Sequence, residues 1–214
     1  GTFIHWLIPD PIISAYPQGD FVYGDNMPQN TEVILTIEDN RETWVEQSSE
    51  YGSVHFDLSP FNLEEGQLIT MTAGSYSQSH RVENIQVIFI DQYEDSVSGI
   101  SEADAALDIC AYHFDIGYNY ECLSLISDST GNWQADFSGL VDLSPGDFGE
   151  AYQYDEFDNS TSISWEITAG SPFITGQKEL NTPEDIDLTI SLTDLYVTDP
   201  DSIYPDDFSL SAMP

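Results

Sequence analysis

An internal repeat constrains the fold of this chain more than any other feature of its sequence. Residues 52–59 (GSVHFDLS) align with residues 131–138 (GNWQADFS), and a turn that contains Pro and Gly follows each copy. Upstream, residues 20–24 (DFVYG) align with residues 95–99 (DSVSG), 75 positions further along. A period of about 75 residues can close a small β-sandwich and is too long for a solenoid unit. We therefore expect tandem sandwiches.

Residues 130–165 show most clearly what the repeat contains. Apolar and polar side chains alternate there in three short runs, which include Trp133 to Phe137, Ala151 to Gln153 and Ile163 to Trp165. This two-residue period is typical of half-buried antiparallel strands. In the earlier copy, Val33, Leu35 and Ile37 form the clearest inward stripe. The pattern predicts an all-β chain.

The N-terminal segment is interrupted by Pro9, Pro11 and Pro17. Proline cannot donate a hydrogen bond to a sheet ladder, so this segment is expected to be an edge strand or a linker rather than a helix. The predicted organisation is an extended segment over residues 1–19, a sandwich over 20–87, a second over 88–169 and a partial domain over 170–214.

The charge of the chain excludes several classes of partner. It carries 39 Asp and Glu against 3 Lys and Arg, a net charge of −36. Attraction to nucleic acid or to an anionic membrane is therefore excluded. The apolar run at residues 3–8 is also too short to span a bilayer. Such a charge indicates bound divalent cations, a saline environment, or an acidic surface that keeps the protein soluble.

Cys110 and Cys122 are the two cysteines, and they lie in adjacent predicted strands at residues 106–114 and 118–126. A disulfide across this hairpin is expected, with two buried free thiols as the alternative. The bond would indicate an oxidising, extracellular location. The histidines His5, His55, His80 and His113 have no partner at zinc-ligand spacing.

Catalysis is not expected. The sequence has no nucleophile elbow, no phosphate-binding Gly-Lys loop and no His-Glu-x-x-His motif, and carboxylate pairs are too common in it to single one out. A carbohydrate-binding module is the stronger rival, because aromatic side chains can stack on sugar rings while also serving as ordinary cross-strand packing. The candidate rings are Trp6, Trp44, Tyr118, Tyr120, Tyr152 and Tyr154. The Asn159-Ser-Thr161 triplet fits a glycosylation acceptor.

The repeated block, with its Asp-Leu-Ser-Pro-Gly-Asp turn at residues 142–147, resembles the immunoglobulin-like repeats of large secreted or surface-attached bacterial proteins. Residues 173–210 are similar to the opening of bacterial cadherin-like, tandem-repeat adhesin domains. The resemblance implies a fold of tandem immunoglobulin-like β-sandwiches with extended terminal strands. A cadherin-like domain normally continues well beyond position 214, so either a longer precursor or a strand from another copy is expected to complete it.

The same resemblance implies calcium between domains, at Glu184, Asp185, Asp199 and Asp201. The residues alone add a candidate cluster at the first junction, Asp91, Glu94 and Asp95, and another in the turn at residues 155–158. Closely spaced carboxylates in turns supply the hard oxygens that Ca²⁺ prefers, although chance clustering is common in so acidic a chain.

Together these features predict a non-enzymatic, extracellular structural or adhesive protein. The expected partner is the chain itself, in a homo-oligomer or a cell-surface filament assembled by β-strand addition through residues 1–19 or 170–214. The alternative is a carbohydrate-binding or calcium-dependent adhesion module of a larger surface protein, with cell-surface glycans as partners.

Overall fold

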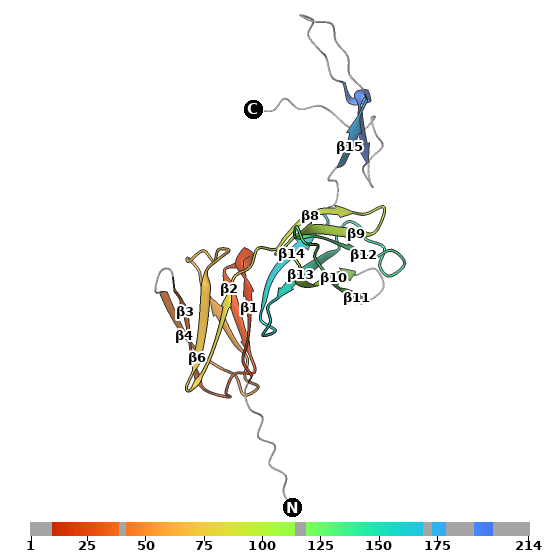
Figure 1. The fold of residues 1–214 in the computed structure, drawn as a ribbon. Coiled ribbons are helices and arrows are strands. Elements are labelled where there is room, and N and C mark those ends of the chain that lie inside the picture. Colours follow the sequence, from red (N-terminus) through yellow and green to blue (C-terminus); the bar gives the residue numbers. More distant parts are fainter. Residues whose placement is uncertain (1–9, 39–41, 114–118, 169–172, 179–190, 199–214) are drawn as a thin grey trace, which may run out of the picture. The chain divides into compact units, whose positions relative to one another are not determined.

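The computed structural model describes residues 10–38, 42–113, 119–168, 173–178 and 191–198. The chain divides into two compact units, Gly1–Glu166 and Ile167–Pro214. The described residues form β-strands and two short 3-10 helices, which confirms the all-β prediction (Figure 1). They contain no helix with the length and hydrophobicity that a membrane span requires.

The first sandwich, β1–β7, occupies the red to yellow part of the chain in Figure 1. One of its layers has the order β4-β3-β6-β7, and the other is β1-β2-β5. Its strands are β1 (Ile12–Tyr16), β2 (Phe21–Asp25), β3 (Glu32–Ile37), β4 (Glu42–Gln47), β5 (Val54–Asp57), β6 (Leu68–Ala73) and β7 (Tyr76–Arg81), with helix η1 (Pro17–Gly19) between the first two.

The second sandwich, β8–β14, repeats this arrangement strand for strand. Its layers have the orders β11-β10-β13-β14 and β8-β9-β12, so each strand matches the one seven places earlier. This correspondence confirms the predicted tandem sandwiches, while the domain boundaries at 87 and 169 stay predictions. The strands are β8 (Gln86–Asp91), β9 (Ser96–Ile100), β10 (Ala106–His113), β11 (Asn119–Ile126), β12 (Asn132–Asp136), β13 (Phe148–Tyr154) and β14 (Ser160–Glu166).

Alternation along the strands places the cores. The predicted stripe of Val33, Leu35 and Ile37 is fully buried in the first sandwich. In the second, two tryptophans cover glycines on the neighbouring strand: Trp133 lies opposite Gly99, and Trp165 lies opposite Gly149. A side chain at either glycine would collide with the indole, so each pair requires glycine for close packing.

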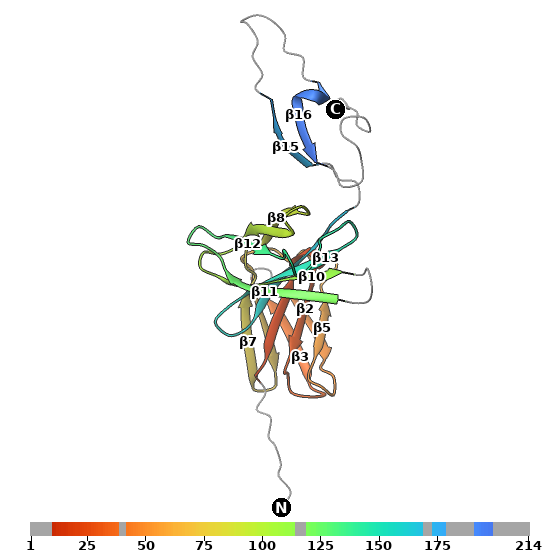
Figure 2. The same ribbon diagram turned by 90° about the vertical axis from the view of Figure 1, so that its right-hand side faces the viewer.

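Strand β1 joins the two sandwiches into one sheet. It pairs with β2 in antiparallel fashion and with β14 in parallel, with Ser14 opposite Ser160 and Ala15 opposite Thr161. The resulting seven-stranded sheet has the order β11-β10-β13-β14-β1-β2-β5 (Figure 2). The expectation of an edge strand or linker is therefore wrong for residues 12–16, because Pro11 and Pro17 flank the strand without interrupting its ladders.

The second unit contains an antiparallel pair, β15 (Phe173–Gln177) and β16 (Leu195–Thr198). Helix η2 (Leu192–Asp194) precedes β16 and is capped by Ser191, whose backbone N–H and hydroxyl both donate to the Asp194 carboxylate.

Candidate functional site

The carboxylates predicted for the first junction, Asp91, Glu94 and Asp95, lie at the end of β8 and in the β8–β9 turn of the second sandwich, where two of them accept hydrogen bonds from backbone N–H groups. Asp91 Oδ1 accepts hydrogen bonds from the backbone N–H groups of Tyr93 and Glu94, at 2.9 and 3.1 Å. Asp95 Oδ1 accepts one from Leu143 N–H at 2.9 Å. Among the described residues, no group of three or more His, Cys, Asp or Glu side chains is arranged to hold a metal ion.

The other four predicted metal ligands, Glu184, Asp185, Asp199 and Asp201, lie outside the described residues. The predicted calcium site therefore stays a prediction for both groups of residues.

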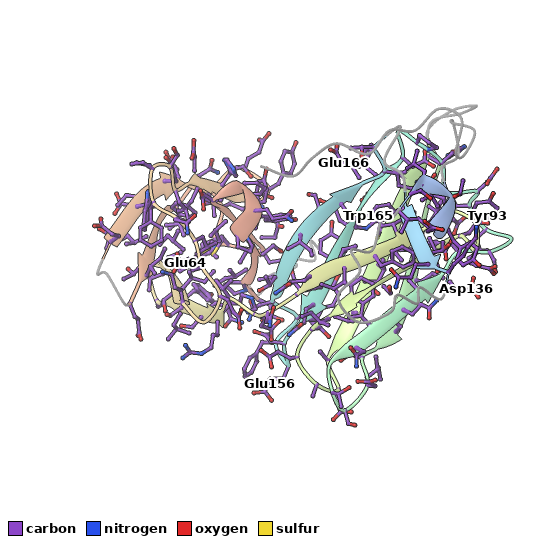
Figure 3. All side chains as sticks on the ribbon, turned by 90° about the horizontal axis from the view of Figure 1, so that it is seen from above. Glu64, Tyr93, Asp136, Glu156, Trp165 and Glu166 are labelled. Carbon is purple, nitrogen blue, oxygen red and sulfur yellow. A yellow bond between two sulfur atoms is a disulfide. The ribbon has the colours of Figure 1, made fainter. Side chains whose placement is uncertain are left out.

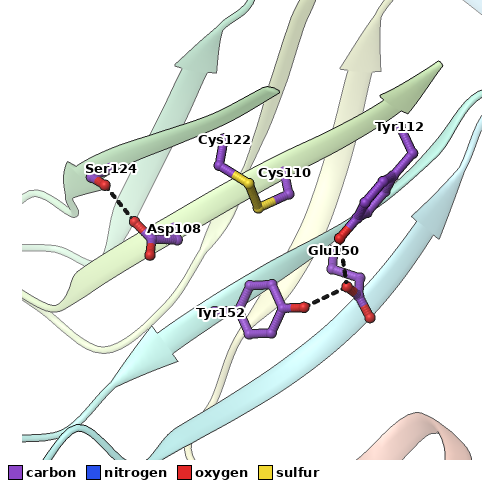
Figure 4. Close-up of a disulfide and its surroundings, with 7 residues drawn as sticks. All are labelled: Asp108, Cys110, Tyr112, Cys122, Ser124, Glu150 and Tyr152. Atoms are coloured by element: carbon purple, nitrogen blue, oxygen red, sulfur yellow. Dashed lines mark hydrogen bonds between the residues drawn. A yellow bond between two sulfur atoms is a disulfide. The ribbon is translucent and has the colours of Figure 1, made fainter. Parts of the chain in front are cut away.

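The predicted disulfide is confirmed. Cys110 on β10 and Cys122 on β11 face each other directly across the ladder and are bonded (Figure 4). Both side chains project from the surface of the seven-stranded sheet that faces away from the cores, because their neighbours Ile109 and Ala111 point inward and are fully buried.

This outer surface carries a set of aromatic side chains that extends over both sandwiches. We call it the aromatic face. In the second sandwich, the buried residues Ala151 and Gln153 alternate with Tyr152 and Tyr154, which therefore point outward. The members of the aromatic face are Tyr16, Phe21, Tyr23, His55, Tyr112, Tyr120, Phe148, Tyr152 and Tyr154.

Glu150 organises the aromatic face in the second sandwich. The hydroxyls of Tyr112 and Tyr152 both donate to Glu150 Oε2, the former at 3.1 Å (Figure 4). On the neighbouring strands, the rings of Tyr112 and Phe148 stack with their centroids 5.1 Å apart. One carboxylate thus fixes the tips of two rings, and cross-strand stacking fixes their planes.

The aromatic face continues across the shared strand β1. Tyr16 lies close enough to Tyr152 for each hydroxyl to influence the pKa of the other, so the aromatic face continues from the second sandwich to the first. Tyr16 also stacks on Phe21, with centroids 4.5 Å apart and planes 20° from parallel. Beyond it, the rings of Tyr23 and His55 are 4.6 Å apart. These contacts follow from the β1–β14 pairing, which brings residues far apart in sequence onto one surface.

Serine residues lie between the aromatic side chains of the first sandwich and those of the second. Ser160 Oγ donates to Ser14 Oγ at 3.1 Å across the β1–β14 pair. Ser160 and Ser162 are 3% and 1% exposed, although both lie on the outer side of β14. The adjacent large side chains therefore cover these serines.

Three tyrosines of the aromatic face, Tyr16, Tyr152 and Tyr154, have raised pKa values. Burial raises the pKa of Tyr152, and the Glu150 carboxylate raises it further. Burial, followed by the charge of Asp108, raises the pKa of Tyr154 to about 12. The pKa of Tyr16 is raised by burial and then by Glu150. Ionising any of these hydroxyls would add a second negative charge beside a carboxylate.

A second polar cluster joins the sandwiches on the other side of the shared sheet. His80 of β7 is fully buried, with Nδ1 3.0 Å from Asp155 Oδ2 and Nε2 2.9 Å from Thr161 Oγ1. A carboxylate only accepts hydrogen bonds, so Nδ1 carries the proton and Nε2 accepts from Thr161. Thr161 Oγ1 in turn accepts from Glu83 N–H at 2.9 Å. The imidazole thereby satisfies both of its nitrogens while neutral.

Asn159 completes this junction. Its Oδ1 accepts from Ile13 N–H at 2.9 Å, and its Nδ2 donates to Asp155 Oδ2 at 2.9 Å. Asn159 is fully buried, so the predicted glycosylation acceptor is inaccessible in the folded chain. The β13–β14 turn that carries these residues, marked by Glu156 in Figure 3, thus binds the first sandwich through its side chains.

The aromatic rings predicted as candidates for sugar binding lie in different places in the structure. Tyr120, Tyr152 and Tyr154 belong to the aromatic face, whereas Trp44 packs edge-on against Phe61 at the first core. Trp6 and Tyr118 lie outside the described residues. Sequence reasoning missed Tyr16, Phe21, Tyr23, Tyr112 and Phe148. Their alternation with apolar neighbours marks them as outward-facing, but nothing local indicates that the two sandwiches share a sheet.

The fold and this surface define a tandem β-sandwich protein with an aromatic, acidic outer face. No family model matches the chain, and no curated protein matches it.

The chain is similar to several solved structures. A tetra-tandem repeat from the extending region of a large adhesion protein is 13% identical, with a TM-score of 0.30, over 77% of this chain and 52% of that one. A Ca²⁺-stabilized adhesin that helps an Antarctic bacterium reach out and bind ice is 14% identical, with a TM-score of 0.25, over 78% and 52%. A pullulanase from Anoxybacillus is 11% identical, with a TM-score of 0.24, over 68% and 24%. The chain spans about half of the first two structures and a quarter of the third.

Proposed function

We propose that this chain is a non-enzymatic, extracellular structural and adhesive module. The Cys110–Cys122 disulfide supports an oxidising location outside the cytoplasm. The net charge of −36 supports a module that stays soluble and separate from nucleic acid and anionic membranes. Two sandwiches that do not move relative to each other are suited to hold a binding surface at a distance from the cell.

The observation that carries this proposal is the parallel pairing of β1 with β14. Tandem domains usually meet through small polar interfaces and move relative to each other. Here a backbone ladder crosses between the sandwiches, and the buried His80–Asp155–Thr161 hydrogen bonds reinforce it. Bending at the junction would break the ladder and expose these buried polar groups, which opposes hinge motion.

Hydrogen exchange of the full chain, followed by mass spectrometry in increasing denaturant, tests this coupling. We expect core amides of β3 and of β10 to lose protection at the same denaturant concentration, because the sandwiches open together. His80→Ala should separate the two transitions, whereas Ser77→Ala, an exposed position on the same strand, should not. Two well-separated transitions in the unaltered chain would contradict a rigid module.

We further propose that copies of the module associate into filaments by strand addition. Strand β1 already has partners on both sides within the chain, so residues 12–16 are not available as a donor. Within residues 170–214, the segments 187–192 and 208–210 are the candidate donors. Residues 187–190 and 208–210, like residues 1–9, lie outside the described residues, and Leu192 begins the 3-10 helix η2. Among the described strands, β5 and β11 form the two edges of the shared sheet. Electron microscopy of the purified chain should show filaments, and the presence of monomers alone would exclude this part of the proposal.

Calcium is the proposed stabilising ion, at Asp91, Glu94 and Asp95 and at the carboxylates near the C-terminus. The support is the unbalanced negative charge, which bound cations would relieve. Thermal unfolding with calcium and with chelator tests it: calcium should raise Tm, and magnesium at equal ionic strength should raise it less. Identical Tm values in calcium and chelator would exclude the ion.

A further inference from the structure

We propose that the aromatic face binds a neutral polysaccharide. The sugar rings would lie against the tyrosine side chains, and sugar hydroxyls would donate to the carboxylates beside them. This inference deepens the adhesive part of the proposed function and rests on it, because it gives the module a ligand class and a binding surface.

The arrangement of the rings is the first support. Three neighbouring pairs are close to parallel: Tyr152 with Tyr154 at 15°, Tyr16 with Phe21 at 20°, and Tyr112 with Phe148 at 22°. Tyr23 is 40% exposed, and Tyr16, Tyr152 and Tyr154 are partly exposed. Rings with an apolar body and a polar tip are suited to ligands that present both C–H groups and hydroxyls.

Fixed carboxylates among these rings are the second support. Glu150 Oε2 receives the hydroxyls of both Tyr112 and Tyr152, which fixes this carboxylate among the rings. Asp108, on the adjacent strand, accepts from Ser124 Oγ at 2.5 Å (Figure 4). Ionised carboxylates accept strong, charge-assisted hydrogen bonds, and sugar hydroxyls are suitable donors.

The charge of the surface decides what kind of ligand it accepts. In the described part of the first unit, Arg81 is the only Lys or Arg, and it lies on β7 in a different sheet. Anionic polysaccharides are therefore repelled, and so is the same face of a second copy. An uncharged, hydroxyl-rich polymer meets no such repulsion and can use the aromatic and the carboxylate groups together.

The width of the aromatic face indicates an oligosaccharide rather than a single sugar. From β13 to β2 the sheet advances by three strand spacings, about 14 Å in all. The disulfide, the Glu150 hydrogen bonds and the Tyr16–Tyr152 contact hold this surface in place before any ligand arrives. Such preorganisation lowers the entropic cost of binding.

Affinity electrophoresis of the full chain tests the proposal directly. Native gels would contain one soluble polysaccharide each: laminarin, dextran, galactomannan or xyloglucan as neutral probes, alginate as the anionic probe, and chitosan as the cationic probe. We expect at least one neutral polysaccharide to retard the chain, with little loss at about 0.5 M salt, where charge attraction is screened. Alginate should not retard it.

Variants assign the binding to the aromatic face. Tyr152→Ala with Tyr154→Ala should weaken retardation about tenfold, since each lost ring contributes roughly 0.5–1.5 kcal/mol. Tyr23→Ala should weaken it and Tyr23→Phe should restore it, at a position exposed enough to leave the fold intact. The matched control is Tyr93→Ala, a 77% exposed tyrosine in the β8–β9 turn (Figure 3).

The proposal is overturned if no neutral probe retards the chain, if Tyr93→Ala weakens binding as much as Tyr23→Ala, or if only chitosan binds and salt abolishes it. The hydrogen-exchange experiment measures the coupling of the two sandwiches and needs no glycan, so its result is independent of glycan binding. Loss of glycan binding with coupled unfolding intact would therefore overturn this inference alone.

Discussion

His80 Nδ1 donates a hydrogen bond to Asp155 Oδ2 over 3.0 Å, and with it the first sandwich holds the β13–β14 turn of the second. The two residues are 75 positions apart in sequence, and the histidine is fully buried. The stability of the junction therefore depends on the protonation of one imidazole.

Acid should weaken this junction. Burial lowers the pKa of His80 below 6.5, against the opposing effect of Asp155. The unfolded chain therefore takes up a proton at a higher pH than the folded chain does. The contribution of neutral His80 is complete above pH 6.5 and is lost as pH falls toward the lowered value.

The free energy of unfolding, measured by urea titration from about pH 7.5 to pH 5, should fall more steeply for the unaltered chain than for His80→Gln. His55→Gln, an exposed histidine of the aromatic face, is the control and should follow the unaltered chain. His80→Ala should cost about 2–3 kcal/mol at neutral pH, because it removes one hydrogen bond from the buried Thr161 hydroxyl and one from Asp155 and leaves a cavity in place of the imidazole. Parallel pH profiles for the chain and His80→Gln would contradict this assignment.

Glu83→Gln should stabilise the chain above neutral pH. Burial raises the pKa of Glu83 to about 7, with a smaller opposing effect from a Gln153 hydrogen bond. The stabilising contribution of a carboxyl with a raised pKa is complete below the ordinary value of 4.5 and is lost as pH rises from there to about 7. Since the side chain is only half-buried, solvent screening reduces the expected gain at pH 8 to about 1 kcal/mol.

That gain should vanish below about pH 4, where Glu83 is protonated in both the folded and the unfolded chain. The comparison variant is Glu46→Gln, an exposed glutamate of β4, which should change little at either pH. An equal gain at both pH values would show that the effect comes from packing and not from the charge of Glu83.

Removing the disulfide should destabilise the second sandwich without unfolding it. The Cys110–Cys122 bond spans 12 positions, and closing so short a loop stabilises a fold by about 2–3 kcal/mol. Cys110→Ala with Cys122→Ala should lower the free energy of unfolding by that amount. Reductant should produce the same loss in the unaltered chain and no change in the double variant, whose response serves as the internal control.

Gly149→Ala tests the packing of tryptophan on glycine. A methyl group at this position would lie 2.0 Å from the Cys110 carbonyl oxygen and 2.2 Å from the Trp165 ring, so one of them must move. We expect a loss of about 3 kcal/mol and a shift of Trp165 fluorescence. Gly176→Ala in β15, whose nearest neighbour would be Tyr196 at 3.5 Å, should be nearly neutral.

Alternation of polar and apolar residues predicted most of the strands, but it predicted little about which strands pair with each other. Alternation placed Val33, Leu35 and Ile37 in the core, and hairpin spacing paired Cys110 with Cys122. The β1–β14 ladder joins residues 146 positions apart, and alternation identifies a strand without identifying its neighbour. The His80–Asp155 hydrogen bond could not be predicted either, because nothing in the sequence distinguishes Asp155 from the other Asp and Glu residues, of which the chain has 39 in all.

The aromatic face shows the same division. Tyr152 and Tyr154 were recognised as outward-facing candidates from their alternation with Ala151 and Gln153. The prolines around Tyr16 predict an edge strand or a linker, and neither prediction places Tyr16 beside Tyr152. The aromatic face extends over both sandwiches only because β1 pairs with β14, so it can be recognised only once that pairing is known.

The shared strand also sets an order for synthesis. Strand β1 precedes the other strands of both sandwiches along the chain, whereas its parallel partner β14 is the last strand of the second sandwich to be made. During that interval β1 presents an unpaired backbone edge on a sandwich that is otherwise complete, and such an edge invites pairing with foreign strands. The nascent N-terminal half therefore passes through a vulnerable stage that ends only when the second sandwich is translated and covers that edge.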